Sequence, residues 1–398
     1  MRNTIIPFTM TEYTLRDLLT IKNGRDHKDL ADGKYPVYGS GGIMRYVDAY
    51  LYDKPSILLP RKGSLSNIQF CETPFWTVDT TYYTEINETL CDPYYLYRYL
   101  TLLNLASFDS GSTVPSMTFD SYYHQKVLLP SLSEQKRASK VLRNIDNKIQ
   151  LNEQINRNLE ELARLIYDYW FIQFDFPDKN GKPYKTSGGK MVYNDQLKRE
   201  IPAGWEVNNI TPLMEILPGG TPSKAKPEYW NGDIPFFGPT DYCGDVFQLS
   251  TEELITEKGL NNCASALYPP KTIFITARGS VGKLIVCGKP MAMNQSCYAL
   301  KPFDLEKYEY LFYLTKQLIE QLKKKGSGSV FKSINTLDIE QSFLSIAPDE
   351  IIDLYCKKVK SIFERIKSNT VEIAELTTLR DRLLPLLMNG QVSVGNQS

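Results

Sequence analysis

The chain has 398 residues, a hydrophobic content of 42% and no net charge, because 46 basic side chains balance 46 acidic ones. This length predicts two or three domains, and the zero net charge argues against nonspecific nucleic-acid binding by charge alone, while leaving room for a local basic patch. No apolar run is long enough to span a bilayer, no signal peptide is expected, and seven scattered cysteines with only two histidines argue against a metal site, so we expect a cytoplasmic protein with reduced thiols.

The first domain is expected over residues 1–131, and its pattern is α+β. Short strand-like runs occupy Ile57–Leu59, Ile68–Phe70 and Thr80–Ile86, and a helix is predicted near Pro93–Leu105. Asp92 before Pro93 is typical of a helix start, with the carboxylate as the N-cap.

A long spacer helix is predicted over residues 132–176. Ser131 and Glu134 have the spacing of a capping box, and Phe176-Pro177 ends the helix. The apolar positions alternate steps of three and four, which is the heptad pattern of a coiled coil. This stripe consists of Leu142, Ile145, Ile149, Asn152, Asn156, Leu159, Ala163, Ile166 and Trp170.

Residues 177–204 indicate a linker of turns and exposed loop, and a second α+β domain is expected over residues 205–347. Its predicted strands are Thr272–Thr276, Leu284–Cys287 and Cys297–Leu300, and its late helix spans Leu305–Lys325. A second spacer helix is predicted over residues 348–390, with the stripe Val359, Ile362, Ile366, Asn369, Ile373, Leu376, Arg380, Leu383 and Leu387. Residues 391–398 form a polar tail that we expect to be disordered.

The two halves of the chain repeat one another. Ile145 and Asn152 match Ile362 and Asn369 at an offset of 217 residues. In the domains, Gly33–Gly39 matches Gly232–Gly238 at an offset of 199, and Ile57–Ser64 matches Ile273–Ser280 at an offset of 216. The change of offset places an insertion of 17 residues between Gly238 and Thr272. Such a duplication predicts two similar surfaces for a target with two separated parts.

The two heptad stripes predict that the helices pack on each other as an antiparallel coiled coil, since the first helix then ends near the second domain. Asn152 and Asn369 lie near the middle of their helices, and we expect them to face each other and fix the register. About 35 to 40 residues at ~1.5 Å per residue give roughly 55 Å of helix, so the domains are expected to lie about one turn of B-DNA or slightly more apart. The alternative, in which each helix covers its own domain, stays open at this point.

Candidate DNA-binding residues lie in glycine turns after short apolar strands. Arginine can donate two hydrogen bonds to guanine, while lysine and serine more often hold phosphate. An equally good interpretation is a hairpin turn with a solvated charge. The candidates are Tyr38, Ser40, Gly41, Arg61, Lys62 and Ser64 in the first domain, and Thr221, Ser223, Lys224, Thr240, Asp241, Arg278, Ser280, Lys283, Lys323, Lys324 and Lys325 in the second. The three lysines also stabilise a helix C-terminus without any ligand, which is the slightly favoured interpretation.

The sequence argues against a catalytic site. Asp92-Pro93-Tyr94-Tyr95 lacks the second proline of an adenine methyltransferase loop, and Gly279–Lys283 lacks the spacing of a Walker motif. Two histidines far apart in the sequence leave little for a Ser-His or Cys-His mechanism. We therefore predict no catalytic residues, no metal and no bound cofactor.

Several longer motifs point to one family. They are Leu129-Pro130 leading into Glu134–Lys136, Leu162–Phe171, Phe176–Lys185 with Ser187–Gly189, Leu197–Trp205, and Gly219–Ser223. With these motifs, the chain resembles the specificity subunit of type I restriction-modification systems over nearly its whole length. The resemblance implies two target-recognition domains that each read half of a bipartite DNA site. It also implies helices that dock two modification subunits, which carry S-adenosylmethionine and methylate adenine, and a restriction subunit that joins them.

The expected function is therefore sequence-specific recognition of double-stranded DNA by a non-catalytic subunit. The alternatives are a coiled-coil scaffold that does not bind nucleic acid and a self-contained methyltransferase or nuclease. Outward-facing helix positions at Arg143, Lys148, Arg157 and Lys358 are the expected docking surface for partner subunits.

Overall fold

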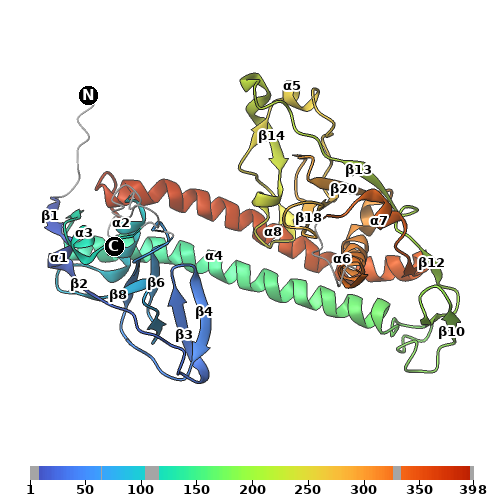
Figure 1. The fold of residues 1–398 in the computed structure, drawn as a ribbon, viewed down its shortest axis with the longest axis horizontal. Coiled ribbons are helices and arrows are strands. Elements are labelled where there is room, and N and C mark those ends of the chain that lie inside the picture. The colour runs from blue at the N-terminus through green and yellow to red at the C-terminus, as the bar shows by residue number, and fades with distance from the viewer. Residues whose placement is uncertain (1–8, 64, 104–115, 326–332, 395–398) are drawn as a thin grey trace. The chain divides into compact units, whose positions relative to one another are not determined.

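A computed structural model describes residues 9–63, 65–103, 116–325 and 333–394. The chain forms two compact units: residues 1–149 together with 375–398, and residues 150–374. We call them the first and the second unit. Each contains one α+β domain and part of both long helices (Figure 1).

The first unit has a central antiparallel sheet in the strand order β2–β8–β5–β6. A second sheet has the order β4–β3–β7, with β7 parallel to β3, and β1 pairs with β9. All five residues of β5 are buried, as the apolar run Ile57–Leu59 predicts. The elements are β1 (Thr11–Thr14), α1 (Leu15–Leu18), β2 (Leu19–Lys22), β3 (Asp32–Gly39), β4 (Gly42–Val47), β5 (Ser56–Pro60), β6 (Gln69–Cys71), β7 (Trp76–Thr77), β8 (Thr81–Ile86), α2 (Pro93–Thr101), α3 (Phe119–Tyr123) and β9 (Lys126–Leu129).

The second unit repeats this topology. Its main sheet has the order β13–β20–β17–β18–β15, its second sheet the order β16–β14–β19 with β19 parallel to β14, and β12 pairs with β21. The elements are β12 (Glu206–Asn208), β13 (Met214–Pro218), η3 (Pro227–Tyr229), β14 (Trp230–Phe237), η4 (Pro239–Asp241), β15 (Phe247–Gln248), β16 (Leu254–Ile255), α5 (Glu257–Leu260), β17 (Ile273–Thr276), β18 (Leu284–Cys287), β19 (Ala292–Met293), β20 (Cys297–Pro302), η5 (Leu305–Lys307), α6 (Tyr308–Lys325), α7 (Thr336–Glu340) and β21 (Leu344–Ile346).

One strand of the main sheet of the second unit has no counterpart among the described residues of the first. β15 lies between Gly238 and Thr272, where the change of repeat offset predicts the insertion, and it adds a fifth strand parallel to β18. The linker also holds more structure than turns and loop, because β10 (Met191–Asn194) and β11 (Arg199–Pro202) form an antiparallel hairpin within residues 177–204.

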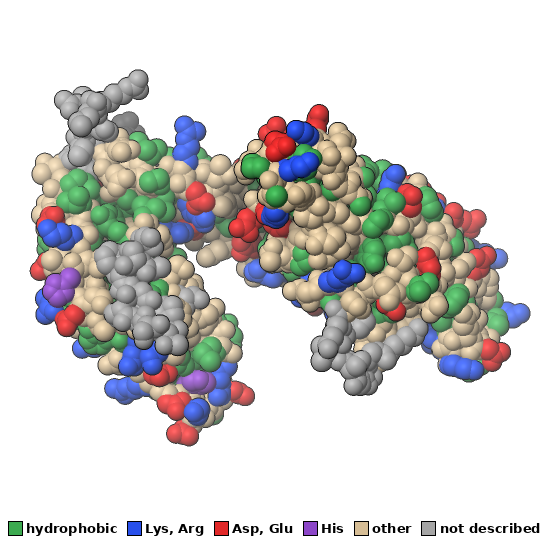
Figure 2. All heavy atoms as spheres, turned by 45° about the horizontal axis from the view of Figure 1, so that its top comes forward, with side chains coloured by type: hydrophobic (Ala, Val, Ile, Leu, Met, Phe, Trp, Pro, Cys, Tyr) green, Lys and Arg blue, Asp and Glu red, His purple; other side chains and the backbone are tan. Residues whose placement is uncertain are grey.

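Charged side chains of both signs are interspersed on the face of the molecule in Figure 2, and no broad area of that face carries a single sign. This agrees with the balanced composition of the whole chain. None of the helices within the described ranges is long and apolar enough to cross a membrane.

The two spacer helices are α4 (Leu132–Tyr167), extended by the π-helical turn η2 (Asp168–Ile172), and α8 (Asp349–Met388), which continues through Pro385. In the first unit, Leu142 near the start of α4 shares a core with Leu384 and Leu387 near the end of α8. In the second unit, Ala163 near the end of α4 shares a core with Val359 near the start of α8. The helices therefore run antiparallel, as the heptad stripes predict.

The register of the pair differs from the predicted one by a helical turn. Asn369 Nδ2 donates to Asn156 Oδ1 at 2.9 Å, whereas Asn152 Nδ2 donates to Glu372 Oε2 at 2.8 Å. Asn152 and Asn369 are both buried, but the structure does not pair them directly. Heptad patterns leave such a shift open, and the observed register gives a hydrogen bond to the amide of each of these three asparagines.

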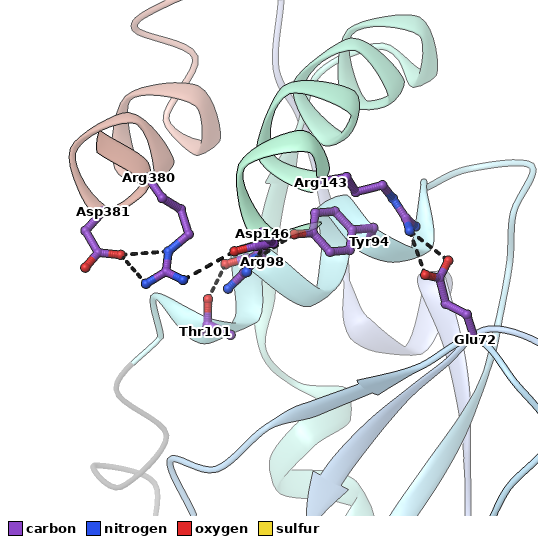
Figure 3. Close-up of polar contacts among 8 residues, drawn as sticks. All are labelled: Glu72, Tyr94, Arg98, Thr101, Arg143, Asp146, Arg380 and Asp381. Carbon is purple, nitrogen blue, oxygen red and sulfur yellow. Dashed lines mark hydrogen bonds and ion pairs between the residues drawn. The ribbon is translucent and has the colours of Figure 1, made fainter. Parts of the chain in front are cut away.

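A buried ionic cluster ties the first domain to the helix pair (Figure 3). Asp146 of α4 accepts hydrogen bonds from Tyr94 and Arg98 of α2, and Arg380 of α8 lies 3.3 Å from it. The side chain of Asp146 is only 11% exposed. At the repeat offset of 217, the second unit has Phe363 and Ala163 in place of Asp146 and Arg380, and both are fully buried. One unit thus uses charge where the other uses apolar packing.

Arg143 is not free for docking, contrary to the expected outward position. Its guanidinium lies 2.7 Å from the Glu72 carboxylate and 4.2 Å from the centre of the Tyr94 ring, both in the first domain (Figure 3). Asp92, the residue before α2, caps that helix as predicted, because Asp92 Oδ1 accepts a hydrogen bond from Tyr95 N at 2.9 Å.

Candidate nucleic-acid interface

Three turns of the first domain meet at the loop Thr77–Thr80, which joins β7 to β8. Arg25 N donates to Thr77 O at 2.8 Å, and Val78 N donates to Tyr38 O at 3.0 Å. Arg61 N donates to Thr80 O at 2.9 Å. These bonds gather the loop after β2, the β3–β4 turn and the turn after β5.

The second domain repeats this arrangement around the loop Met293–Ser296. Gly220 N donates to Met293 O at 3.2 Å, and Asn294 N donates to Phe237 O at 2.9 Å. Ala277 N donates to Ser296 O at 2.7 Å. We call the four loops of each domain its loop cluster: residues 23–26, 38–42, 61–63 and 77–80 in the first, and 219–226, 238–242, 277–283 and 293–296 in the second.

Glycines make the close approach of these loops possible. A Cβ atom at Gly24 would lie 2.1 Å from the carbonyl oxygen of Val78, and one at Gly219 would lie 1.9 Å from that of Asn294. Gly63 and Gly279 occupy the left-handed region, with φ of 89° and 77°, in the two turns after β5 and β17. The same backbone is therefore built twice.

The first-domain candidates divide between the cluster and the core. Tyr38 packs against the Phe75 ring with centroids 6.2 Å apart, and burial raises the pKa of its hydroxyl, so its side chain belongs to the core. Arg61 Nη1 donates to Asp79 O at 3.3 Å, and Lys62 is exposed. Ser40 lies beside Gly63, with its hydroxyl 3.4 Å from where a Cβ would stand. Ser64 lies outside the described residues.

The candidates near β14 are mostly engaged within the domain. The Thr221 hydroxyl bonds to the Gln295 amide oxygen. Lys224 pairs with Glu253, and its amine lies 3.9 Å from the Trp230 ring centre. Ser223 O accepts from the same indole at 3.1 Å, and exposed Thr240 lines a cavity of about 260 Å³ with Asp241 and Asn294.

Arg278, Ser280 and Lys283 are exposed in one turn between β17 and β18. Lys283 lies 5.1 Å from the ring centre of Tyr242, and it shares a cavity of about 200 Å³ with Lys323. Lys324 lines a different cavity, of about 560 Å³, and the side chain of Lys325 lies outside the description. Of the two described lysine side chains of this run, Lys323 therefore lies beside the Arg278–Lys283 turn and Lys324 does not.

The structure adds three exposed residues that sequence reasoning missed: Arg25, Asp79 and Gln295. In the sequence, Arg25 could have been found only from the equivalent glycines Gly24 and Gly219 before the two loops. The separation of these glycines matches none of the repeat offsets found above, so the sequence comparison does not align them. Among the described residues Arg25, Lys62 and Arg278 form no ion pair, so the fold leaves these three cations available to a ligand. The described part of the chain holds no group of three or more His, Cys, Asp and Glu side chains placed to bind a metal ion.

Comparison with known proteins agrees with this duplicated architecture. The family model of the type I restriction modification DNA specificity domain matches residues 7–161 and again residues 202–378. The HindI specificity subunit of Haemophilus influenzae is 29% identical over 337 residues, which cover 72% of this chain and 73% of that protein. The MjaIX specificity subunit of Methanocaldococcus jannaschii is 26% identical over 381 residues, with coverage of 92% and 86%.

The fold itself matches a solved structure. The S subunit of a type I restriction-modification system from M. genitalium superposes with a TM-score of 0.62 at 15% identity, and the match covers 98% of each chain. The two segments matched by the family model are the two that the structure folds alike, and together they span most of the chain. The chain therefore belongs to the type I restriction-modification DNA specificity family.

Proposed function

We propose that each domain reads one half of a bipartite DNA site through its loop cluster. The observation that carries this proposal is the repeated backbone of the two clusters with different exposed side chains upon it. Arg25, Lys62 and Asp79 are exposed in the first cluster, whereas the equivalent places of the second hold the buried Gly220, which has no side chain, and the exposed Arg278 and Gln295. Equal scaffolds with unequal side chains suit two half-sites of different sequence on one duplex.

The chain acts as a specificity subunit and supplies no catalytic group. The two motifs that invite an enzymatic interpretation have structural roles, since Asp92 caps α2 and Gly279–Lys283 forms the turn between β17 and β18. We propose that two modification subunits dock on the helix pair, bind S-adenosylmethionine and methylate an adenine in each half-site. A restriction subunit joins this complex, and the assembly acts on DNA in the cytoplasm.

The test is to assemble the full chain with its modification subunit and to map methylated adenines in exposed DNA. The expected motif has two specified parts separated by unspecified bases. Replacing residues 1–131 by the equivalent domain of a relative should change one part and keep the other. A motif that changes in both parts, or in neither, would contradict the assignment of one domain to one half-site.

A further inference from the structure

The loop at the centre of each cluster presents one exposed side chain. In Thr77–Thr80, the exposed residue is Asp79, while its neighbours are buried or half-buried. In Met293–Ser296, the exposed residue is Gln295, and its neighbours are again buried or half-buried. The two residues stand at the same place, because Arg61 N bonds to the residue after Asp79 and Ala277 N bonds to the residue after Gln295.

Neither side chain is needed to hold its loop. The loops are fixed by backbone hydrogen bonds, from Arg25 and Arg61 in the first domain and from Gly220 and Ala277 in the second. The identity of residues 79 and 295 is therefore free to differ without changing the fold. The backbone at these two positions is held in place, while the side chains are exposed and do not pack in the core. Such a position is suited to determining specificity.

Gln295 is oriented for recognition. Its amide oxygen accepts a hydrogen bond from the Thr221 hydroxyl, and Thr221 is fixed in turn because Gly220 N bonds to Met293 O. This contact lowers the rotational freedom of the amide and leaves its NH₂ group directed away from Thr221. A glutamine amide pairs with adenine by donating to N7 and accepting from the N6 amino group in the major groove.

Asp79 offers different chemistry at the same place. Its carboxylate forms no ion pair among the described residues, and a carboxylate can accept from the N4 amino group of cytosine. Arg61 Nη1 donates to the carbonyl oxygen of Asp79. Arg25 N donates to the carbonyl oxygen of Thr77, which lies two residues before Asp79 in the chain. These two cations offset the repulsion between the carboxylate and the DNA phosphates.

We propose that residues 79 and 295 are equivalent base-reading positions: Gln295 reads an adenine in one half-site, and Asp79 reads a cytosine in the other. Thr221 is a positioning residue for Gln295. This inference rests on the proposed function, and it adds which residue reads a base and which base class it selects.

The experiment uses the full chain assembled with its modification subunit and a panel of duplexes. Each duplex carries one substituted base pair of the methylated motif, and the methylation rate on each gives the discrimination at that position. Gln295→Ala should lower discrimination at a single A·T pair of one half-site by roughly tenfold or more. Asp79→Ala should do the same at a single G·C pair of the other half-site.

Thr221→Val supplies a second, independent variant. Loss of its hydroxyl should weaken discrimination at the same A·T pair as Gln295→Ala, by a smaller factor, and at no other position. Gln196→Ala in the β10–β11 hairpin and Asp53→Ala outside the clusters are matched controls, and both should keep wild-type discrimination at every position. Thermal unfolding of each variant should stay that of the wild type, since no backbone bond is lost.

The outcomes separate this inference from the proposed function. If the wild-type complex methylates no bipartite motif, the proposed function falls and the inference falls with it. If the wild type methylates such a motif while Gln295→Ala and Asp79→Ala keep full discrimination, only the inference is overturned. An equal loss of rate on every duplex would also overturn it, because that pattern belongs to a structural residue.

Discussion

Glu309 in α6 is a buried carboxyl group without a full set of partners. It is 4% exposed, and its Oε2 atom has no hydrogen-bond partner in the described structure. Burial raises its pKa from 4.5 to about 7, against a weaker lowering by Lys271. The folded state therefore keeps a proton that the unfolded state releases, so the contribution of Glu309 to stability is fully present below pH 4.5 and is lost as the pH rises towards 7. The loss is on the order of 3 kcal/mol.

The first prediction follows from this pH dependence. Glu309→Gln should remove the decline between pH 4.5 and 7, because the amide needs no proton to stay neutral. Thermal unfolding across this pH range measures the effect, and above pH 7 the variant should unfold at the higher temperature. Glu350→Gln, an exposed carboxyl at the start of α8, is the control and should follow the wild type. A Glu309→Gln profile parallel to that of the wild type would contradict the raised pKa.

Gly219 tests the construction of a loop cluster. An alanine Cβ at this place would overlap the carbonyl oxygen of Asn294, so the loop 293–296 must move. Gly219→Ala should cost about 2 kcal/mol or more in stability and weaken recognition of one half-site. Unfolding and the duplex panel measure the two effects. Gly41→Ala, where a Cβ would meet no atom within 4 Å and the backbone is not left-handed, is the stability control.

Sequence alone could find some of the interface and not the rest. Arg61, Lys62 and Arg278 were within reach because a glycine turn follows an apolar strand at a constant offset. Arg25 was not, because the loops after β2 and β13 differ in length between the domains and carry no periodic pattern. Asp79 and Gln295 keep the offset of 216, but no glycine turn after an apolar strand marks them. The place of Arg25 in the cluster depends on a hydrogen bond between segments far apart in the chain, from Arg25 N to Thr77 O, which the bond from Gly220 N to Met293 O repeats in the second domain.

At the scale of the elements, the cluster around Asp146 joins α2, α4 and α8. Asp146→Ala should destabilise the first unit by about 3–5 kcal/mol, because it takes away the carboxylate shared by Arg98 and Arg380, whose side chains are only 13% and 22% exposed. Replacing Asp146, Arg98 and Arg380 together by apolar residues of similar size should cost less than the single change. Asp381→Ala removes only an exposed partner of Arg380 and should cost less than about 1 kcal/mol. Chemical denaturation measures the free energy of unfolding of all three variants. A triple variant less stable than Asp146→Ala would refute the idea that unpaired charge causes the loss of stability.

The elements were more predictable than their register. Heptad spacing located both long helices, and apolar runs located β5, β17 and β20, since each reflects a local period. The pairing of Asn369 with Asn156 was missed because a shift by one turn keeps the same stripe in contact. Polar partners such as Thr370, which Asn156 Nδ2 approaches at 3.4 Å, decide between the two registers.

At the scale of the whole molecule, the helix pair offers a test of how the half-sites are spaced. Gln150 in α4 and Ala374 in α8 lie at the boundary of the two units. Inserting one heptad after each residue lengthens both helices by about 10 Å and keeps the heptad pattern. The unspecified segment of the methylated motif should then grow by about three base pairs.

A one-sided insertion is the control for this experiment. Seven residues added to α4 alone displace Asn156 from Asn369, so the chain should lose stability and methylation rather than gain a longer motif. A two-sided variant that keeps the original motif spacing would show that the helices do not set the distance between the half-sites.

The contrast between Asp146 with Arg380 and Phe363 with Ala163 limits how these proteins can exchange recognition modules. A junction at residue 131 transfers α2 and its Arg98 but leaves Asp146 behind in the recipient. If the incoming module has no basic residue in place of Arg98, Asp146 keeps Arg380 but loses one of its two arginine partners. The hybrid protein would then be less stable than the parent, whether or not DNA is bound. An exchanged first domain should therefore carry an arginine in place of Arg98. An exchanged second domain needs only an apolar side chain that packs well against Phe363 and Ala163.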